Sequence, residues 1–223
     1  MRSVTYQAGG LRLAIFSLNH NAISKKNHAP GTAGAHVRYM GRAEAEPEIL
    51  TNHMPAEVNA ARSWVDRYER ESRANARVAD TIMVALPREL GEHQRAELVR
   101  RYMDELGKGE IPYFAAIHQR GKDAQNPHAH ILLCDKSVLS GLRVLGTSEM
   151  GSTTKLREKW SYVASESLRE AGHAEGIDHR SYAEQGIDKE PGQHRGPNMP
   201  GSWADKIRSE SSGFSVIRQG LAA

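Results

Sequence analysis

The sequence contains a single cysteine, Cys134, among 223 residues, which excludes an intrachain disulfide framework. Cys134 lies in an apolar run and is expected to fill space in the core. Aromatic residues make up only 6% of the chain, too few for the extensive base stacking of general single-strand binders. No apolar stretch reaches the ~20 residues of a membrane span, and the first residues do not follow a signal-peptide pattern. We therefore expect a cytoplasmic protein without membrane insertion.

Basic and acidic residues are nearly balanced in number. Lysine and arginine together number 30 against 27 aspartate and glutamate, so the formal net charge is +3. Most of the basic residues are arginines, whose guanidinium groups make planar two-point contacts with phosphate. The composition therefore admits a nucleic-acid partner without establishing one. The 39% of hydrophobic residues suffices for the core of one domain of ordinary size.

Hydrophobic periodicity predicts a chain that mixes strands and helices. The expected strands cover residues 11–18, 78–86, 111–118 and 128–134. The expected helices cover residues 35–42, 57–75, 92–106 and 155–171. This order predicts an α+β fold in which a mainly antiparallel sheet is covered by helices. The polar residues 19–34 are expected to form a loop.

The composition changes near the end of the chain. Beyond Pro191 the sequence is rich in glycine, proline and serine and loses its periodicity. We expect residues 1–190 to form the folded domain. Residues 191–223 are expected to form an extended arm or linker.

Three histidines fall where a hairpin would bring them together. His118 ends one predicted strand, and His128 and His130 begin the next at i, i+2 spacing, on one face of that strand. The intervening loop contains glycine and proline, which is typical of a hairpin. Three imidazoles can hold a metal ion and leave positions open for a substrate. Separate surface histidines, in a chain with eleven of them, are the competing interpretation, which the third histidine at the pairing position disfavours.

The expected cofactor is one divalent metal ion. Three neutral nitrogens suit Mn²⁺, Zn²⁺, Ni²⁺ or Co²⁺ better than Mg²⁺. Oxygens from a substrate phosphate would add hard ligands, however, and so admit Mg²⁺. We favour Mn²⁺ or Mg²⁺, with Zn²⁺, Ni²⁺ and Co²⁺ as alternatives.

Tyr39 differs from the other tyrosines in its charged surroundings. It lies between Arg38 and Arg42, downstream of Lys25 and Lys26. A phenol with a pKa of about 10 is a weak nucleophile at neutral pH. A metal ion on a phosphodiester, together with nearby cations, favours attack by the phenolate. We expect Tyr39 to be the nucleophile and the four basic residues to contact DNA; a partly buried aromatic on a short helix is the competing interpretation.

Three motifs occur in a fixed order along the chain. They are ALPREL at 85–90, NPHAH at 126–130 preceded by Ile117 and His118, and IDHRSYAEQGID at 177–188 followed by PGQHRGPN at 191–198. Together they resemble the MobA/MobL family of plasmid relaxases, within the HUH endonuclease superfamily. The resemblance implies an HUH relaxase-like sheet that carries the metal site, and a nucleophilic tyrosine near the N-terminus, which maps onto Tyr39.

The resemblance also implies a reaction and its partners. The substrate would be single-stranded or hairpin DNA, nicked at a plasmid origin of transfer to give a 5′-phosphotyrosyl linkage and a free 3′-hydroxyl that permits rejoining. The implied partners are accessory mobilisation proteins and a secretion coupling protein. The alternatives are an HUH replication initiator or transposase, a DNA-binding module without catalysis, and a metal-dependent hydrolase that uses water.

The chain departs from the family pattern at one position. Relatives often carry a glutamate where this sequence has Thr81. The neighbouring Asp80 is a candidate to support the metal ligands, although adjacent residues of a strand point to opposite faces. Asn126 is the other candidate for such support. Arg180, in the last motif, is expected to contact DNA.

Overall fold

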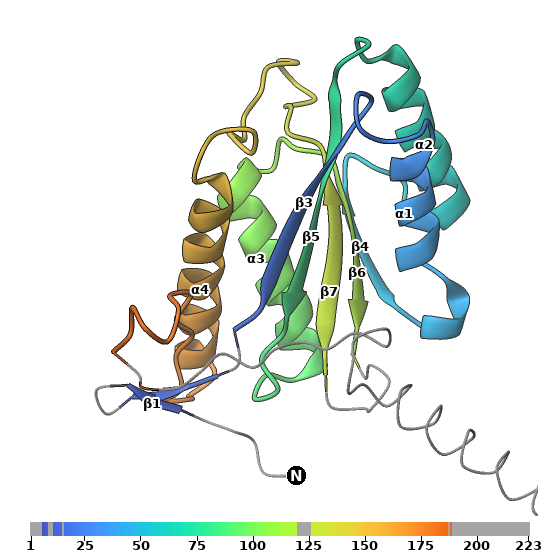
Figure 1. Cartoon of the computed structure of the whole chain (residues 1–223). Helices are drawn as coiled ribbons and strands as arrows, with labels where there is room; N and C mark the ends of the chain where they lie inside the picture. The colour runs from blue at the N-terminus through green and yellow to red at the C-terminus, as the bar shows by residue number, and fades with distance from the viewer. Residues whose placement is uncertain (1–5, 9–10, 15, 120–125, 187, 189–223) are drawn as a thin grey trace, which may run out of the picture. The chain divides into compact units, whose positions relative to one another are not determined.

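The computed structural model describes residues 6–8, 11–14, 16–119, 126–186 and 188. Helices lie on both sides of a central sheet (Figure 1). The strands are β1 (Tyr6–Ala8), β2 (Leu11–Leu13), β3 (Leu18–Ser24), β4 (Glu48–Asn52), β5 (Arg77–Ala85), β6 (Tyr113–His118) and β7 (His128–Leu133). The helices are α1 (Thr32–Met40), the 3-10 turn η1 (Ala43–Ala45), α2 (Val58–Glu71), α3 (Glu92–Gly107) and α4 (Ser152–Glu170).

The central sheet has the strand order β3-β5-β7-β6-β4, and each neighbouring pair is antiparallel. Strands β1 and β2 pair only with each other among the described residues. Strands β6 and β7 form the predicted hairpin, in which His118 pairs directly with His128. The expected antiparallel sheet covered by helices is therefore confirmed.

Alternation along the strands supplies a separate hydrophobic core to each face of the sheet. On one face, Ile82 and Ile131 pack in a cluster with residues of α3 and α4. Within that cluster the rings of Tyr102 and Trp160 meet edge to face, with centroids 5.0 Å apart. On the other face, Phe114 and Leu132 belong to a smaller cluster with residues of α1 and α2. Cys134 is buried in this second cluster, as expected.

Helix α1 is fixed closely against α2 and over part of the sheet. Gly34 allows this approach, because a Cβ atom at that position would overlap the Asp66 carboxylate on α2. On its sheet side α1 packs on β7 and β6. The C-terminal end of α1, which carries Tyr39, is thereby held over the strands that carry the three histidines.

Two predictions about the N-terminal part of the chain are wrong. The expected strand 11–18 is replaced by β2 and by β3, which begins at Leu18 and runs through residues expected to form a loop. The polar sequence of β3 suits an edge strand, because Asn19 and Asn21 face solvent while His20 finds buried polar partners. Strand β4, which follows Pro47, was not expected; the four predicted helices are all present, with shifted ends.

The C-terminal part divides from the rest at Arg180, giving units Met1–Arg180 and Ser181–Ala223. In the second unit the Ser181 hydroxyl accepts a hydrogen bond from the Glu184 backbone N–H at 3.3 Å. The arm predicted over residues 191–223 lies outside the described residues.

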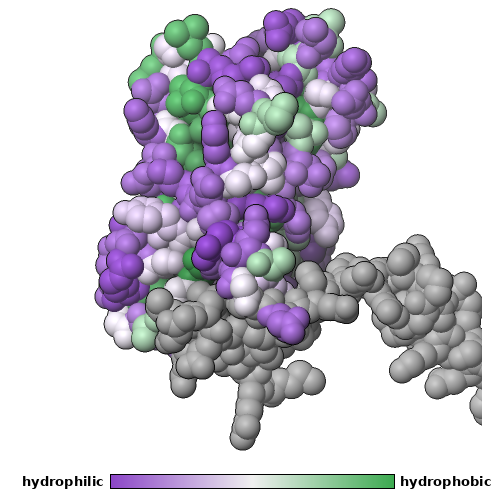
Figure 2. Space-filling model, turned by 60° about the vertical axis from the view of Figure 1, so that its left-hand side comes forward, coloured by the Kyte–Doolittle hydropathy of each residue, from purple (hydrophilic) through white to green (hydrophobic). Residues whose placement is uncertain are grey.

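The segment between β7 and α4 exposes apolar side chains at the end of the sheet away from the histidines. The exposed residues there are Val138, Leu139, Leu142, Val144 and Met150. Figure 2 shows hydrophobic surface gathered toward that end, with hydrophilic surface around it. Among the described residues, none of the helices combines the length and the apolar character needed to cross a membrane.

Candidate metal and nucleophile site

The hairpin gathers three histidines at one end of the sheet. His118 and His128 face each other across the β6–β7 pair, and their rings stack with centroids 5.0 Å apart. His130 lies two residues further along β7, with its ring 5.4 Å from that of His118 and 5.1 Å from that of His128. The structure therefore brings together the three residues singled out in the sequence.

Backbone carbonyls orient two of these rings. His128 Nδ1 donates to the carbonyl oxygen of Asn126 at 2.8 Å, which leaves Nε2 as the acceptor. Asn126, a candidate support of the ligands, thus contacts His128 through its main-chain carbonyl. His118 is buried and hydrogen-bonds the backbone of Met40, while its Nε2 is buried with no partner among the described residues.

These distances can be compared with those around a bound ion. With nitrogen–metal bonds of about 2.1 Å, the ring centroids of three histidine ligands stand about 5 Å apart, as they do here. Among the residues that the structure describes, however, no three His, Cys, Asp or Glu side chains already form a ligand group. The His118 and His128 rings explain why, since they lie 7° from parallel and lone pairs in stacked planes cannot meet at one ion. Rotation of one ring about its soft χ2 torsion, at the expense of its hydrogen bond to the backbone, removes this obstacle, so the residues fit a metal ion after that adjustment.

Burial favours the neutral form of His118 and His130. Burial and then the charges of His128 and His118 lower the pKa of His130 to about 4. Burial is also the main cause that lowers the pKa of His118, followed by His128 and Arg42. The buried, unpaired Nε2 of His118 offers a lone pair that a metal ion could use.

Tyr39 stands beside this cluster on α1. Its side chain is 58% exposed, and its ring meets that of His130 edge to face with centroids 6.4 Å apart. The Arg42 guanidinium lies over the Tyr39 ring, 4.3 Å from its centroid, and Arg42 Nη1 donates to the Tyr39 carbonyl at 2.8 Å. An exposed phenol between a cation and the histidine cluster is accessible to a phosphodiester.

The surface next to Tyr39 remains open. Met83 on β5 pairs with His130 on β7 and therefore shares its face. Since α1 packs on β7 and β6, Met83 is left 36% exposed. Asn19 pairs with Met83 from the edge strand β3 and is exposed as well. A strip of uncharged side chains thus leads from the sheet edge to the histidines.

The basic residues expected to contact DNA fall into two groups. Arg38 and Lys26 are exposed. Lys25 instead donates to the Glu69 and Ser72 carbonyls at 3.0 and 2.7 Å, where it neutralises the C-terminal end of α2.

Arg180 is likewise engaged within the protein. Its guanidinium forms a two-point ion pair with Asp178, with the shortest contact at 2.6 Å. Arg180 and Lys25 are therefore weaker candidates for DNA contact than the sequence indicated.

Asp80 lies on the wrong face for the role considered for it. Asp80 and Met83 are three residues apart on β5, so they point to opposite sides of the sheet, and Met83 is on the side of the histidine cluster. Asp80 is fully buried and bonds His20 at 2.8 Å and Thr147 at 2.9 Å. The expectation that Asp80 supports the metal ligands is contradicted by this placement.

Comparison with known proteins places the chain in a family. The profile of the MobA/MobL family matches residues 24–142 and 146–201, which include Tyr39 and all three histidines. The chain belongs to the MobA/MobL family. Mobilization protein A of Escherichia coli is 33% identical to this MobA/MobL chain over 94% of the chain and 32% of the relative. The 43 kDa relaxation protein of Salmonella typhimurium is 26% identical over 75% of the chain and 55% of the relative.

The chain therefore spans about a third and about half of these two relatives. A solved structure, described as "Molecular Basis of Vancomycin Resistance Transfer in Staphylococcus aureus", superposes with a TM-score of 0.54 at 21% identity. It covers 76% of this MobA/MobL chain and all of the compared chain. This likeness concerns the fold alone, which is the expected α+β fold with an antiparallel sheet covered by helices.

Proposed function

We propose that this chain is a divalent-metal-dependent relaxase that nicks one DNA strand at an origin of transfer and can rejoin it. The observation that carries the proposal is the exposed Tyr39 ring, 6.4 Å from the His130 ring of a three-histidine cluster. Family membership supports it, and so do the names of the relatives, a mobilization protein and a relaxation protein. The substrate would be single-stranded or hairpin DNA.

The three histidines would hold the ion through their free nitrogens. A divalent ion bound there would neutralise charge that develops on the scissile phosphate. Tyr39 Oη then forms a bond to phosphorus while the bond from phosphorus to the 3′-oxygen breaks. Arg42, over the Tyr39 ring, stabilises the phenolate form of the nucleophile. Because one phosphoester replaces another, the 3′-hydroxyl can reverse the reaction without an external energy source.

The open strip beside the site suits a single strand better than a duplex. Exposed Arg38 and Lys26 would neutralise phosphates, while Asn19 and Met83 offer amide and apolar contacts to bases. Binding that depends on phosphate neutralisation weakens steeply as salt is raised. Accessory mobilisation proteins and a coupling protein of a secretion system would be the partners of the nicked complex.

The experiment that tests the proposal uses labelled single-stranded oligonucleotides that tile both strands flanking the coding gene. Each is incubated with the wild type or with Tyr39→Phe, in Mn²⁺ or in EDTA, and read on a denaturing protein gel. We expect a metal-dependent covalent adduct with the wild type and none with Tyr39→Phe. Cleavage without an adduct would instead indicate a metal-dependent hydrolase, and binding without cleavage a non-catalytic DNA-binding module.

A further inference from the structure

A fourth histidine lies beside the nucleophile, outside the hairpin. His36 precedes Tyr39 by three residues on α1, so the two side chains are neighbours on one flank of the helix. Both are exposed, unlike Val37 and Met40, which turn toward the core. The helix therefore presents an imidazole and the nucleophilic phenol together.

The surroundings of His36 connect it to the same site. Its charge acts on His130 of β7, and the charge of His28, in the segment before α1, acts on His36. His128, His118 and Arg42 are the other charged groups that act on His130. Among the described residues, no carboxylate contributes to the electrostatics of His36, His118 or His130. The groups that these interactions place around Tyr39 are imidazoles and the Arg42 guanidinium.

Most of these groups cannot take a proton. The three hairpin histidines are reserved for the metal ion under the proposed function, and Arg42 is always protonated. The acceptor nitrogen of a neutral His28 is occupied, because its Nδ1 already accepts a hydrogen bond from the Ser24 backbone N–H at 3.3 Å. The ring of His36 has no hydrogen-bond partner in the part of the chain that the structure describes, so its acceptor nitrogen is available.

We infer that His36 is the general base that activates Tyr39, an inference that rests on the proposed function. The phenolic proton moves to the acceptor nitrogen of His36 as Tyr39 Oη bonds to phosphorus. The bond from phosphorus to the 3′-oxygen breaks, and that oxygen takes up a proton from water. In rejoining, the His36 imidazolium returns its proton to the departing Tyr39 oxygen. The base is thus carried on the same helix as the nucleophile and not on the sheet.

The protonation state of His36 agrees with this role. Partial desolvation of the His36 ring at the surface of α1, and then the charge of His28, lower the pKa of His36 below its ordinary value. His36 is therefore a neutral proton acceptor at neutral pH.

The test measures single-turnover adduct formation with the oligonucleotide that reacts with the wild type, in Mn²⁺, across a range of pH. His36→Ala is compared with His93→Ala, which removes an exposed histidine in the first turn of α3. We expect His36→Ala to form adduct about 100-fold more slowly, with unchanged oligonucleotide affinity, and to regain rate when imidazole is added. Its rate should also climb with pH toward the pKa of the phenol, whereas the wild-type rate should level off once His36 is neutral.

The two proposals fail in different ways. If no oligonucleotide gives an adduct with the wild type, the proposed function is overturned, and this inference with it. If the wild type reacts and His36→Ala reacts at a similar rate with the same pH profile, only the role of His36 is overturned. A slow His36→Ala that imidazole does not rescue, and whose pH profile matches the wild type, would also overturn it, since a purely structural defect behaves in that way. His36→Gln, which keeps a polar side chain, should be as slow as His36→Ala.

Discussion

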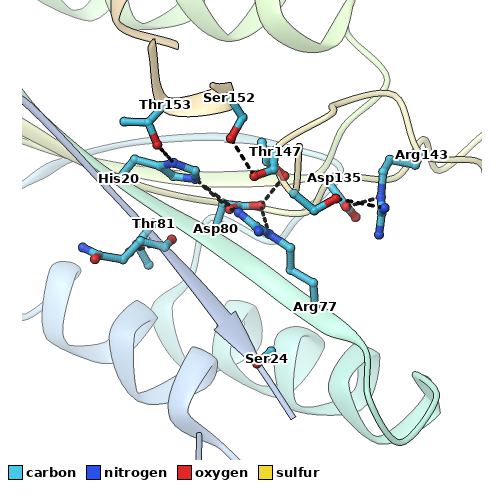
Figure 3. Close-up of polar contacts among 12 residues, drawn as sticks. His20, Ser24, Arg77, Asp80, Thr81, Asp135, Arg143, Thr147, Ser152 and Thr153 are labelled. Atoms are coloured by element: carbon cyan, nitrogen blue, oxygen red, sulfur yellow. Dashed lines mark hydrogen bonds and ion pairs between the residues drawn. The ribbon is translucent and has the colours of Figure 1, made fainter. Parts of the chain in front are cut away.

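Buried histidines on the two faces of the sheet differ in whether their ring nitrogens have hydrogen-bond partners. On the α3 and α4 face, His20 lies between Asp80 and the Thr153 hydroxyl, at 2.8 and 2.9 Å. Asp80 in turn bonds Arg77 and Thr147, so each oxygen of its carboxylate has partners (Figure 3). On the α1 and α2 face, the buried Nε2 of His118 has no partner among the described residues, and no carboxylate balances the cluster.

The difference separates a structural polar network from the proposed metal site. A buried polar group left unpaired costs about 1–3 kcal/mol, whereas a fully satisfied network fixes a single arrangement of the chain. The network around Asp80 joins β3, β5 and the segment before α4 in this way. Histidines that look alike in the sequence thus have a structural role on one face and, under the proposed function, bind a metal ion on the other.

The largest effect is expected for a variant that disrupts the hydrogen-bonded network around Asp80 on the α3 and α4 face. Asp80→Ala removes the partner of His20 and Arg77, and breaking a buried ion pair costs about 3–5 kcal/mol. We expect urea unfolding in the absence of metal to show a loss of this size. Asp104→Ala, an exposed site on α3, serves as the control and should stay within about 0.5 kcal/mol of the wild type. An unchanged midpoint for Asp80→Ala would contradict the structural role of the network.

The same variant has a defined pH dependence. Burial alone would raise the pKa of Asp80, but hydrogen bonds from His20 and Arg77 hold it below its ordinary value of 3.8. A carboxylate with a depressed pKa in the folded state contributes stability that is present above the unfolded pKa and is lost as the pH falls through the folded one. The difference between wild type and Asp80→Ala should therefore stay constant at neutral pH and shrink below pH 3.8.

The second-largest effect is expected for a variant of the histidine cluster on the α1 and α2 face. His118→Ala deletes one expected ligand, so Mn²⁺ binding measured by calorimetry should be lost and adduct formation should slow by about 100- to 1000-fold. The free energy of unfolding without metal should change by only about 1 kcal/mol, because the unpaired Nε2 leaves together with the ring. A large destabilisation with intact Mn²⁺ binding would show that His118, like Asp80, stabilises the fold and does not bind the metal ion.

The smallest effect distinguishes two adjacent lysines near the site. Lys25→Met removes two hydrogen bonds to carbonyls at the end of α2 and should cost about 1 kcal/mol of stability. It should leave the salt dependence of oligonucleotide binding unchanged. Lys26→Met, the matched control, should leave stability unchanged and reduce the salt slope by about one. The reverse pattern would mean that Lys25 reaches DNA.

Features that depend on neighbouring residues could be predicted from the sequence. The spacing of His128 and His130, with a turn before them, was enough to predict the hairpin and the meeting with His118. Strand β3 was missed because Asn19 and His20 give it a polar sequence, and the partner that makes His20 suitable for a strand, Asp80, lies far along the chain. Contacts of this kind depend on tertiary structure and leave no periodic signal.

Within the site, too, contacts between residues far apart in the sequence could not be predicted. Tyr39 was singled out by its basic neighbours, but which of those cations were already engaged depended on distant carbonyls, as Lys25 illustrates. His36 was overlooked because a lone histidine on a short helix carries no motif. It became a candidate only when the fold brought α1 over β7.

The direct pairing of His118 with His128 has an evolutionary consequence. The two residues are the last of one strand and the first of the next, so the ladder of the hairpin fixes their separation. The sequence between them can therefore lengthen, shorten or change its charge without displacing either imidazole.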